Sequence, residues 1–340
     1  MHGLTLIPVG PFWQPFFCGM LDFMAEANEI LYAALKPALE RVEQVRLEKL
    51  ASLERRKKIA WPVGAVISLV CGRIDWFLLM AFKDSDDGFV GVTVFALGLL
   101  YGWVTQPRRE YIKQYKQDIM PRIAKAAADL VYDVKGTLSM DTIKPSKIVP
   151  SYDKAVCEDG FTGCYKGTDI NFCELKLTET QGSGKNRRTV TKFKGLVILL
   201  EMNRKFLGHT ILVRDQNSIG SWFTEKTSKM MRADLVDPAF EKLYNVYTTD
   251  QVEARYLIDP VMMEKLTDMK NHYKGENITA AYFNSQMLIM ISSAYNFFEP
   301  PDIYKPAIDM EAVKMLRDEV EQIVSIIDYL EIHDPRQKVA

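Results

Sequence analysis

The sequence predicts an α+β protein: a two-helix transmembrane hairpin with amphipathic flanking helices, followed by a cytoplasmic α+β domain of mainly antiparallel strands with a C-terminal helix. Three observations predict it. Two apolar stretches lie close together in the first third of the chain, strand-like alternation begins near residue 151, and a helical apolar stripe lies near the C-terminus. The predicted segments are an apolar, Pro-rich start at 1–20, an amphipathic cytoplasmic helix at 21–58, the hairpin at 59–105, a juxtamembrane helix and linker at 106–139, the cytoplasmic domain at 140–332 and a tail at 333–340.

The two apolar stretches are long enough to cross a membrane as helices. They cover 59–82 and 88–105, which are 24 and 18 residues long, and about 20 mostly apolar residues span the hydrocarbon core of a bilayer. Trp61 and Trp103 lie near stretch ends, where aromatic residues gather at membrane interfaces. The alternative interpretation is a buried helical hairpin in a soluble protein.

Basic residues flank both outer ends of the apolar stretches, and they predict an orientation. They are Arg55, Arg56, Lys57 and Lys58 before the first stretch, and Arg108, Arg109, Lys113 and Lys116 after the second. The connecting loop at 83–87 carries one Lys and three Asp. Because positively charged flanks stay in the cytoplasm, we expect a multi-pass protein of the plasma membrane with both termini cytoplasmic. The basic flanks favour this interpretation over the soluble hairpin.

Two charged residues, Arg73 and Asp75, interrupt the first apolar stretch. At ~1.5 Å per residue, Arg73 would lie roughly 21 Å along the helix from Ile59, past the bilayer midplane. A long side chain at that depth can extend toward the headgroups. We interpret the two residues as an intramembrane polar pair near the outer boundary, with an ion or proton relay as the alternative. Residues at i and i+2 do not share a helix face, so a partner helix would supply their contacts.

Composition excludes several classes of function. The chain has 340 residues and a net charge of −1, so no overall positive field attracts nucleic acid. Its hydrophobic content of 48% argues against disorder. Five Cys are scattered without a C-x-x-C pair, and none of the four His stands at metal-ligand spacing. We therefore predict no metal, no cofactor and no nucleic-acid partner, and we assign no catalytic residue.

Apolar alternation and turn residues predict most elements of the cytoplasmic domain. Strands are expected at 168–180, 189–203, 209–214, 244–247, 278–284 and 286–292. Asp250 and Asp259 are expected to cap helices, since Glu253 follows the first at capping-box spacing and Pro260 follows the second. Helices are also expected at 22–58, with a kink or break at Pro37, and at 108–134, with a break at Pro121. Residues 136–150 are expected to form a linker.

Two amphipathic helices could pack on their own chain or contact another one. The helix at 21–58 carries Leu39, Val42, Leu50 and Leu53 at near-heptad spacing. The last helix, 310–331, repeats apolar residues at Val313, Leu316, Val320, Ile323, Ile327 and Leu330. A stripe of this kind covers a core or forms a seam with a protein partner or a second copy of the chain.

A cluster of basic residues occupies the turn and the second strand of the first predicted β-hairpin. It comprises Lys185, Arg187, Arg188, Lys192 and Lys194. One interpretation is a solvated hairpin tip without a binding role. The functional one is contact with a partner or with anionic membrane lipid, where each basic residue contributes about 1 kcal/mol. The Gly-Ser-Gly-Lys at 182–185 is not a phosphate loop, because Asn186 follows the Lys and the next element is a strand.

Two later stretches resemble a known family. KFKGLVILLEMNRKFLGHTILVRD at 192–215 and FEKLYNVYTTDQVEARYLIDPVMMEKL at 240–266 are similar to the bacterial "domain of unknown function 3137" family. The amphipathic helix, the two apolar stretches and the later FFEPP at 297–301 follow the same layout, so the resemblance extends over about 40–332. It implies a bacterial inner-membrane protein with a cytoplasmic domain, and it transfers no catalytic residues.

These observations favour a membrane-anchored cytoplasmic binding or scaffold module that recognises a protein partner or anionic lipid. A subunit of a transport or channel assembly is one alternative, and it would require oligomers because two spans cannot form a pore. A membrane-bound enzyme is the other, and it would require the polar groups of Glu174, Asp169, Asp215 and His209 to converge in one cleft.

Overall fold

The fold is α+β, with one long N-terminal helix and one large antiparallel sheet. A computed structural model describes residues 14–81, 91–184, 187–203, 205–214, 230–233, 235, 237–272 and 277–332, and within these the side chains of 14–30 and 269–272 are left out. The helices are α1 (Gln14–Ala81), α2 (Val92–Asp118), α3 (Met120–Ala128), α4 (Met140–Ile143), α6 (Pro238–Leu243), α7 (Gln251–Leu257), α8 (Pro260–His272), α9 (Met310–Val324) and α10 (Ile326–Tyr329). The strands are β1 (Val131–Asp133), β2 (Lys154–Tyr165), β3 (Thr168–Gln181), β4 (Arg188–Glu201), β5 (Thr210–Arg214), β6 (Met231–Arg232), β7 (Tyr244–Thr248), β8 (Asn277–Phe283) and β9 (Gln286–Ser292).

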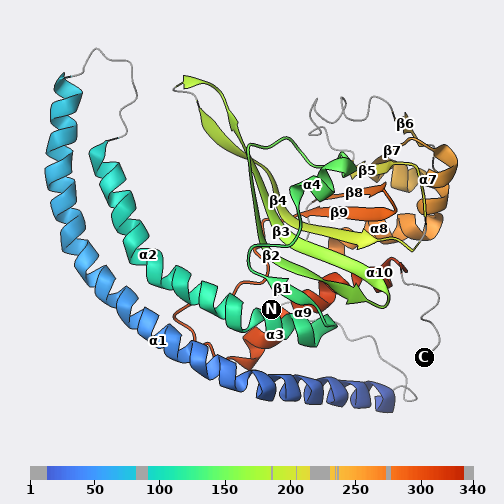
Figure 1. Ribbon diagram of the computed structural model, residues 1–340, viewed down its shortest axis with the longest axis horizontal. Coiled ribbons are helices and arrows are strands. Elements are labelled where there is room, and N and C mark those ends of the chain that lie inside the picture. Colours follow the sequence, from blue (N-terminus) through green and yellow to red (C-terminus); the bar gives the residue numbers. More distant parts are fainter. Residues whose placement is uncertain are drawn as a thin grey trace.

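The nine described strands form one sheet in the order β1-β2-β3-β4-β9-β8-β5-β7-β6, and every pairing is antiparallel (Figure 1). The strands expected at 168–180, 189–203, 209–214, 244–247, 278–284 and 286–292 are confirmed as β3, β4, β5, β7, β8 and β9. The hairpin β3–β4 is the longest in the sheet and pairs from Ile170–Leu200 to Gln181–Arg188. Alternate residues of β4 lie in the cores on the two faces of the sheet, with Leu196 and Ile198 in one and Val197 and Leu199 in the other, which explains its nearly continuous apolar sequence.

Strands β1 and β2 were not expected from the sequence. The register of β2 against β3 shifts between Glu158 and Phe161, where Asp159 has a φ of 51°. This bulge breaks the alternation by which strands are recognised. Helix α3 ends at Ala128 because its C-cap residue, Asp129, has a left-handed backbone conformation (φ 51°). Strand β1 then begins at Val131. The expected helix at 108–134 is therefore wrong in its last part, although its break before Pro121 is confirmed.

Each face of the sheet has its own apolar core. One core joins the sheet to α1, α2, α3 and α9, and it includes Leu39, Tyr115 and Phe172. The other core lies beneath residues 138–149, where Leu138 and Ile143 are buried. The expectation of a linker at 136–150 is therefore wrong, because this stretch covers one face of the sheet. Its apolar residues are few and irregularly spaced, so no periodic pattern revealed their burial.

Helix α1 runs without interruption through Pro37 and Pro62 and curves along its length (Figure 1). The expected interruption at Pro37 is wrong, because the helix tolerates the missing backbone donor while its neighbours Leu35 and Leu39 are buried. The last helix divides at Ser325 into α9 and α10, and the whole predicted stripe, from Val313 to Leu330, is buried.

The outer parts of α1 and α2, which are residues 59–81 and 92–105, have different surroundings from the remaining, inner parts of the two helices. In the inner parts, Leu53 and Tyr111 belong to the core of the sheet domain. The outer parts extend away from the sheet, side by side (Figure 1). The two helices are joined there by the backbone N–H groups of Val92 and Thr93, which donate to Asp75 on α1.

Candidate functional site

The outer parts of α1 and α2 carry an exposed apolar surface. Its larger side chains are Ile59, Trp61, Val63, Val66, Leu69, Val70, Ile74, Trp76, Phe77, Leu79 and Met80 on α1, and Val92, Val94, Phe95, Leu97, Leu99, Tyr101 and Trp103 on α2. Among the described residues, one helix, Leu31–Ala81, is long and apolar enough to cross a membrane by length and composition, and its apolar window is wholly unburied. An apolar surface of this extent on a soluble monomer is unusual.

The two charged residues of the first stretch lie in different surroundings. Asp75 accepts hydrogen bonds from the backbone N–H of Val92 (2.7 Å) and Thr93 (3.0 Å), so it caps the N-terminus of α2 from the neighbouring helix. Gly91 precedes these donors, and a Cβ there would lie 2.5 Å from the Asp75 carboxylate. Arg73 is exposed on α1. Asp75 therefore links the two helices, and the interpretation of Arg73 and Asp75 as an intramembrane polar pair stays a prediction.

The predicted basic cluster is divided by the structure. Arg187 and Arg188 are exposed at the start of β4. Lys192 forms an ion pair with Glu179 across the hairpin (2.9 Å), and hydrogen bonds from Lys192, Gln181 and Ser151 lower the pKa of Glu179 to about 2. Lys194 lies further along β4 and donates to the carbonyl of Ala294 (3.2 Å). Lys185 lies outside the described residues.

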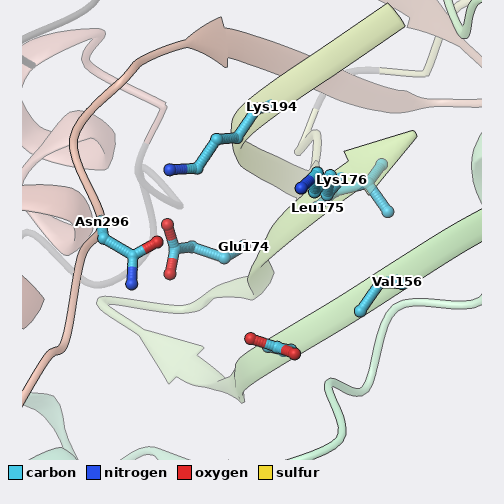
Figure 2. Close-up of a pocket in the computed structure, with 7 residues that line it drawn as sticks. Val156, Glu174, Leu175, Lys176, Lys194 and Asn296 are labelled. Atoms are coloured by element: carbon cyan, nitrogen blue, oxygen red, sulfur yellow. The ribbon is translucent and has the colours of Figure 1, made fainter. Parts of the chain in front are cut away.

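Lys194 lines a pocket that the sequence did not suggest. This pocket has a volume of about 340 Å³ and is lined by Val156, Glu158, Glu174, Leu175, Lys176, Lys194 and Asn296. Its walls come from β2, β3, β4 and the segment after β9. In Figure 2 the Glu174 carboxylate points toward the amide of Asn296, and Lys194 extends toward the same opening from above. The volume lies at the lower end of the range of small-molecule sites, about 300–1,000 Å³.

The charges in the pocket follow the register of the strands. Glu158 on β2 stands directly opposite Glu174 on β3. Two positions further along, Lys176 on β3 stands opposite Lys194 on β4. Side chains at i and i+2 share one face of a strand, so a pair of carboxylates and a pair of ammonium groups lie in adjacent rows. Like charges directly opposite each other destabilise a sheet.

The pKa of the Glu174 carboxyl group is strongly raised. It is 9% exposed, and burial raises its pKa to about 7, although the N–H of Phe297 donates to its Oε1 (3.2 Å) and opposes the shift. The nearby charges of Asp159 and Glu299 also raise its pKa, while Lys116 lowers it. A buried carboxyl group that titrates near neutral pH marks a functional-site candidate.

The segment between β9 and α9 connects this pocket to the helices. Glu319 on α9 accepts the N–H of Phe298 (2.8 Å), a buried residue whose φ of 56° is uncommon for a bulky side chain. Glu299 contacts Lys116 of α2 (3.3 Å), and Lys116 forms a shorter, buried ion pair with Asp159 (2.6 Å). Burial lowers the pKa of Lys116, but the attraction of Asp159 and Glu299 outweighs it and raises the pKa above its ordinary value.

Further along the same segment, residues 302–307 lie against α1 and α2. Arg46 donates to the carbonyl of Ile303 (2.7 Å), and the paired Glu43 accepts the N–H of Ala307 (2.7 Å). Arg108 of α2 forms an ion pair with Asp302 (2.8 Å). Arg108 and Lys116, two of the basic residues predicted to set membrane orientation, therefore also hold the sheet domain to the helices.

The three described polar residues considered for catalysis, Glu174, Asp169 and His209, do not converge. Glu174 faces the pocket, whereas Asp169 is exposed at the start of β3, roughly 17 Å away at ~3.3 Å per strand residue. His209 lies 2.9 Å from the carbonyl oxygen of Ser146 through Nε2, and burial lowers its pKa. Asp215 lies outside the described residues. Within the described part of the chain, no group of three or more His, Cys, Asp or Glu could hold a metal ion.

Comparisons with known proteins agree with the resemblance found in the sequence. Residues 191–332 match the family described as "Protein of unknown function (DUF3137)". Among solved structures, the chain is similar to the crystal structure of the mycobacterial trehalose monomycolate transport factor A, TtfA, at 12% identity over 60% of this chain and 95% of that chain. The TM-score is 0.32, which is too low to support a shared fold or activity. No curated protein matches the chain.

Proposed function

We propose, from the premise that residues 191–332 form a region of the DUF3137 family, that this chain is a membrane-anchored binding or scaffold module of the bacterial inner membrane. Helices α1 and α2 cross the membrane as a hairpin, both termini are cytoplasmic, and the sheet domain is held at the inner leaflet. There it recognises a protein partner or anionic lipid.

The unburied apolar surface of α1 and α2 carries this proposal. Moving a large apolar side chain out of water is worth about 1.5–3 kcal/mol, so this surface supplies a driving force on the order of tens of kcal/mol. The cost of Arg73 in the span, about 2.5–3.5 kcal/mol, is far smaller. The soluble alternative would require this surface to be buried, and the apolar window of α1 is wholly unburied.

The contacts of residues 302–307 with α1 and α2 attach the sheet domain firmly to these helices, which supports a scaffold rather than a loosely tethered domain. The inner parts of α1 and α2 share one core with the sheet, and the ion pair of Arg108 with Asp302 adds a polar contact. The anchor and the sheet are therefore joined by a continuous core. The amphipathic stripes at 21–58 and 310–331 lie largely within this core, so we assign partner contact to another surface.

The exposed end of the β3–β4 hairpin is the proposed contact surface for a partner or lipid. Among the described residues of this end, Arg187 and Arg188 are exposed charges, and the hairpin projects beyond the sheet toward the same side of the molecule as the outer ends of α1 and α2 (Figure 1). Lys192 contributes less, because its charge is balanced by Glu179.

Charge reversal tests this contact. The full chain with Arg187→Glu and Arg188→Glu, extracted from native membrane, should lose bound protein or anionic lipid that the wild type retains, as measured by mass spectrometry. A matched control reverses Lys125 and Lys135, which are exposed elsewhere on the domain. Loss of a protein identifies a protein partner, and loss of anionic lipid identifies a lipid contact. Equal retention by all three proteins would rule out the hairpin end as the recognition surface.

A further inference from the structure

The pocket shown in Figure 2 has the features of a preformed binding site. Four segments of the chain supply its walls, and Glu174, which is more than nine-tenths buried, points into it. Only Oε1 of this carboxylate receives a hydrogen bond from the described residues, and none of the ion pairs among those residues includes Glu174.

Burying a carboxylate without a charged partner is costly, and placing it directly opposite Glu158 adds repulsion. The neighbouring row has the same problem with the opposite sign, because Lys176 stands opposite Lys194. A ligand with a cationic group at the first row and an anionic group at the second would relieve both repulsions at once.

The spacing of the rows defines the length of such a ligand. Two residues along a strand advance about 6.6–6.8 Å. The two ends of an extended dipeptide are separated by nearly the same distance, at most about 7 Å, because it has the same backbone repeat. Asn296 at the rim can donate to and accept from a peptide group between the two charges.

We propose that this pocket binds a small zwitterion of dipeptide length, with its ammonium group between Glu158 and Glu174 and its anionic group between Lys176 and Lys194. A free dipeptide and the ethanolamine phosphate headgroup of a lipid share this chemistry. The site goes beyond the proposed membrane anchoring and does not depend on it, since it lies wholly within the sheet domain.

Calorimetry on the full chain in detergent at pH 8, where Glu174 is ionised, tests the proposal. The probes are Ala-Ala, N-acetyl-Ala-Ala, Ala-Ala amide and glycerophosphoethanolamine. Ala-Ala should bind at least about tenfold more tightly than either blocked analogue, because each analogue removes one charge-assisted contact. Binding of glycerophosphoethanolamine without Ala-Ala would keep the zwitterion site and identify a lipid source. If neither zwitterion binds, or the blocked analogues bind equally well, the proposal is wrong.

Two variants separate a binding role from a structural one. Glu174→Gln with Lys194→Gln should weaken zwitterion binding at least about tenfold. The control, Glu179→Gln with Lys192→Gln, removes a Glu and a Lys from the same two strands outside the pocket and should leave binding unchanged. Lys176 is exposed, so Lys176→Gln will fold, and it should weaken binding of Ala-Ala but not of its amide. Equal weakening of both by Lys176→Gln would contradict the assigned anion row.

Discussion

At the scale of single residues, the role of a charged side chain in this protein depends on which residues of other segments it contacts. The sequence predicted that Asp75 forms a polar pair with Arg73 and that a partner helix contacts them, and in the structure Asp75 caps α2 from the adjacent helix. The sequence places Lys194 in a cluster of five basic residues, whereas in the structure it lines a pocket with Glu174. The sequence could not show which helix contacts Asp75, or that Lys194 lines a pocket, because both depend on which strand or helix lies alongside.

Glu174 should make the stability of the protein depend on pH. The unfolded chain ionises this group near its ordinary pKa of 4.5, whereas the folded chain retains the proton to about 7. Between these values the folded state binds more protons, so stability falls as pH rises. At pH 8 the loss amounts to at most about 3 kcal/mol.

Glu174→Gln should remove this dependence, because the Gln oxygen can still accept the N–H of Phe297 without charge. Thermal unfolding of the full chain in detergent, followed by circular dichroism from pH 4.5 to 8, measures it. The variant should be more stable than the wild type at pH 8 and similar to it at pH 4.5. Glu179→Gln serves as the control and should keep the slope. An unchanged slope in Glu174→Gln would show that this carboxyl group ionises normally in the fold.

At the scale of elements, regular patterns were predicted well and irregular ones were not. Strands β3, β4, β8 and β9 alternate or run apolar without interruption, and the caps at Asp250 and Asp259 follow ordinary helix chemistry. Strand β2 was missed because its bulge at Asp159 disturbs the alternation. The cover at 138–149 was missed because short helical turns carry too few apolar residues to form a pattern.

The segment after β9 acts as the joint between sheet and helices, and hydrogen exchange tests it. The Ala307 N–H is donated to Glu43, whose carboxylate is held in place by Arg46. Arg46→Met should therefore increase exchange at Ala307 and around Ile303, since both contacts depend on the guanidinium. Arg41→Met, at an exposed position on the same helix, is the control. If exchange in this segment matches the wild type, the joint does not depend on Arg46.

At the scale of the whole molecule, one helix belongs to two environments. The inner part of α1 lies in the core of the sheet domain, and its outer part presents unburied apolar residues. The sequence predicted the apolar stretches from length and composition. It could not predict that their inner extensions pack into the sheet, because that packing depends on segments more than a hundred residues away.

Labelling of single cysteines from outside the cell tests the proposed membrane topology of α1 and α2. In a full-length chain lacking its five native Cys, single Cys residues are placed at Ser85, between the two apolar stretches, and at Ala340. Spheroplasts are then treated with a membrane-impermeant maleimide. We expect labelling of Ser85→Cys in intact spheroplasts and of Ala340→Cys only after lysis, with the protein retained in the membrane at alkaline pH. Labelling of both positions only after lysis, or recovery of the chain in the soluble fraction, would contradict this topology.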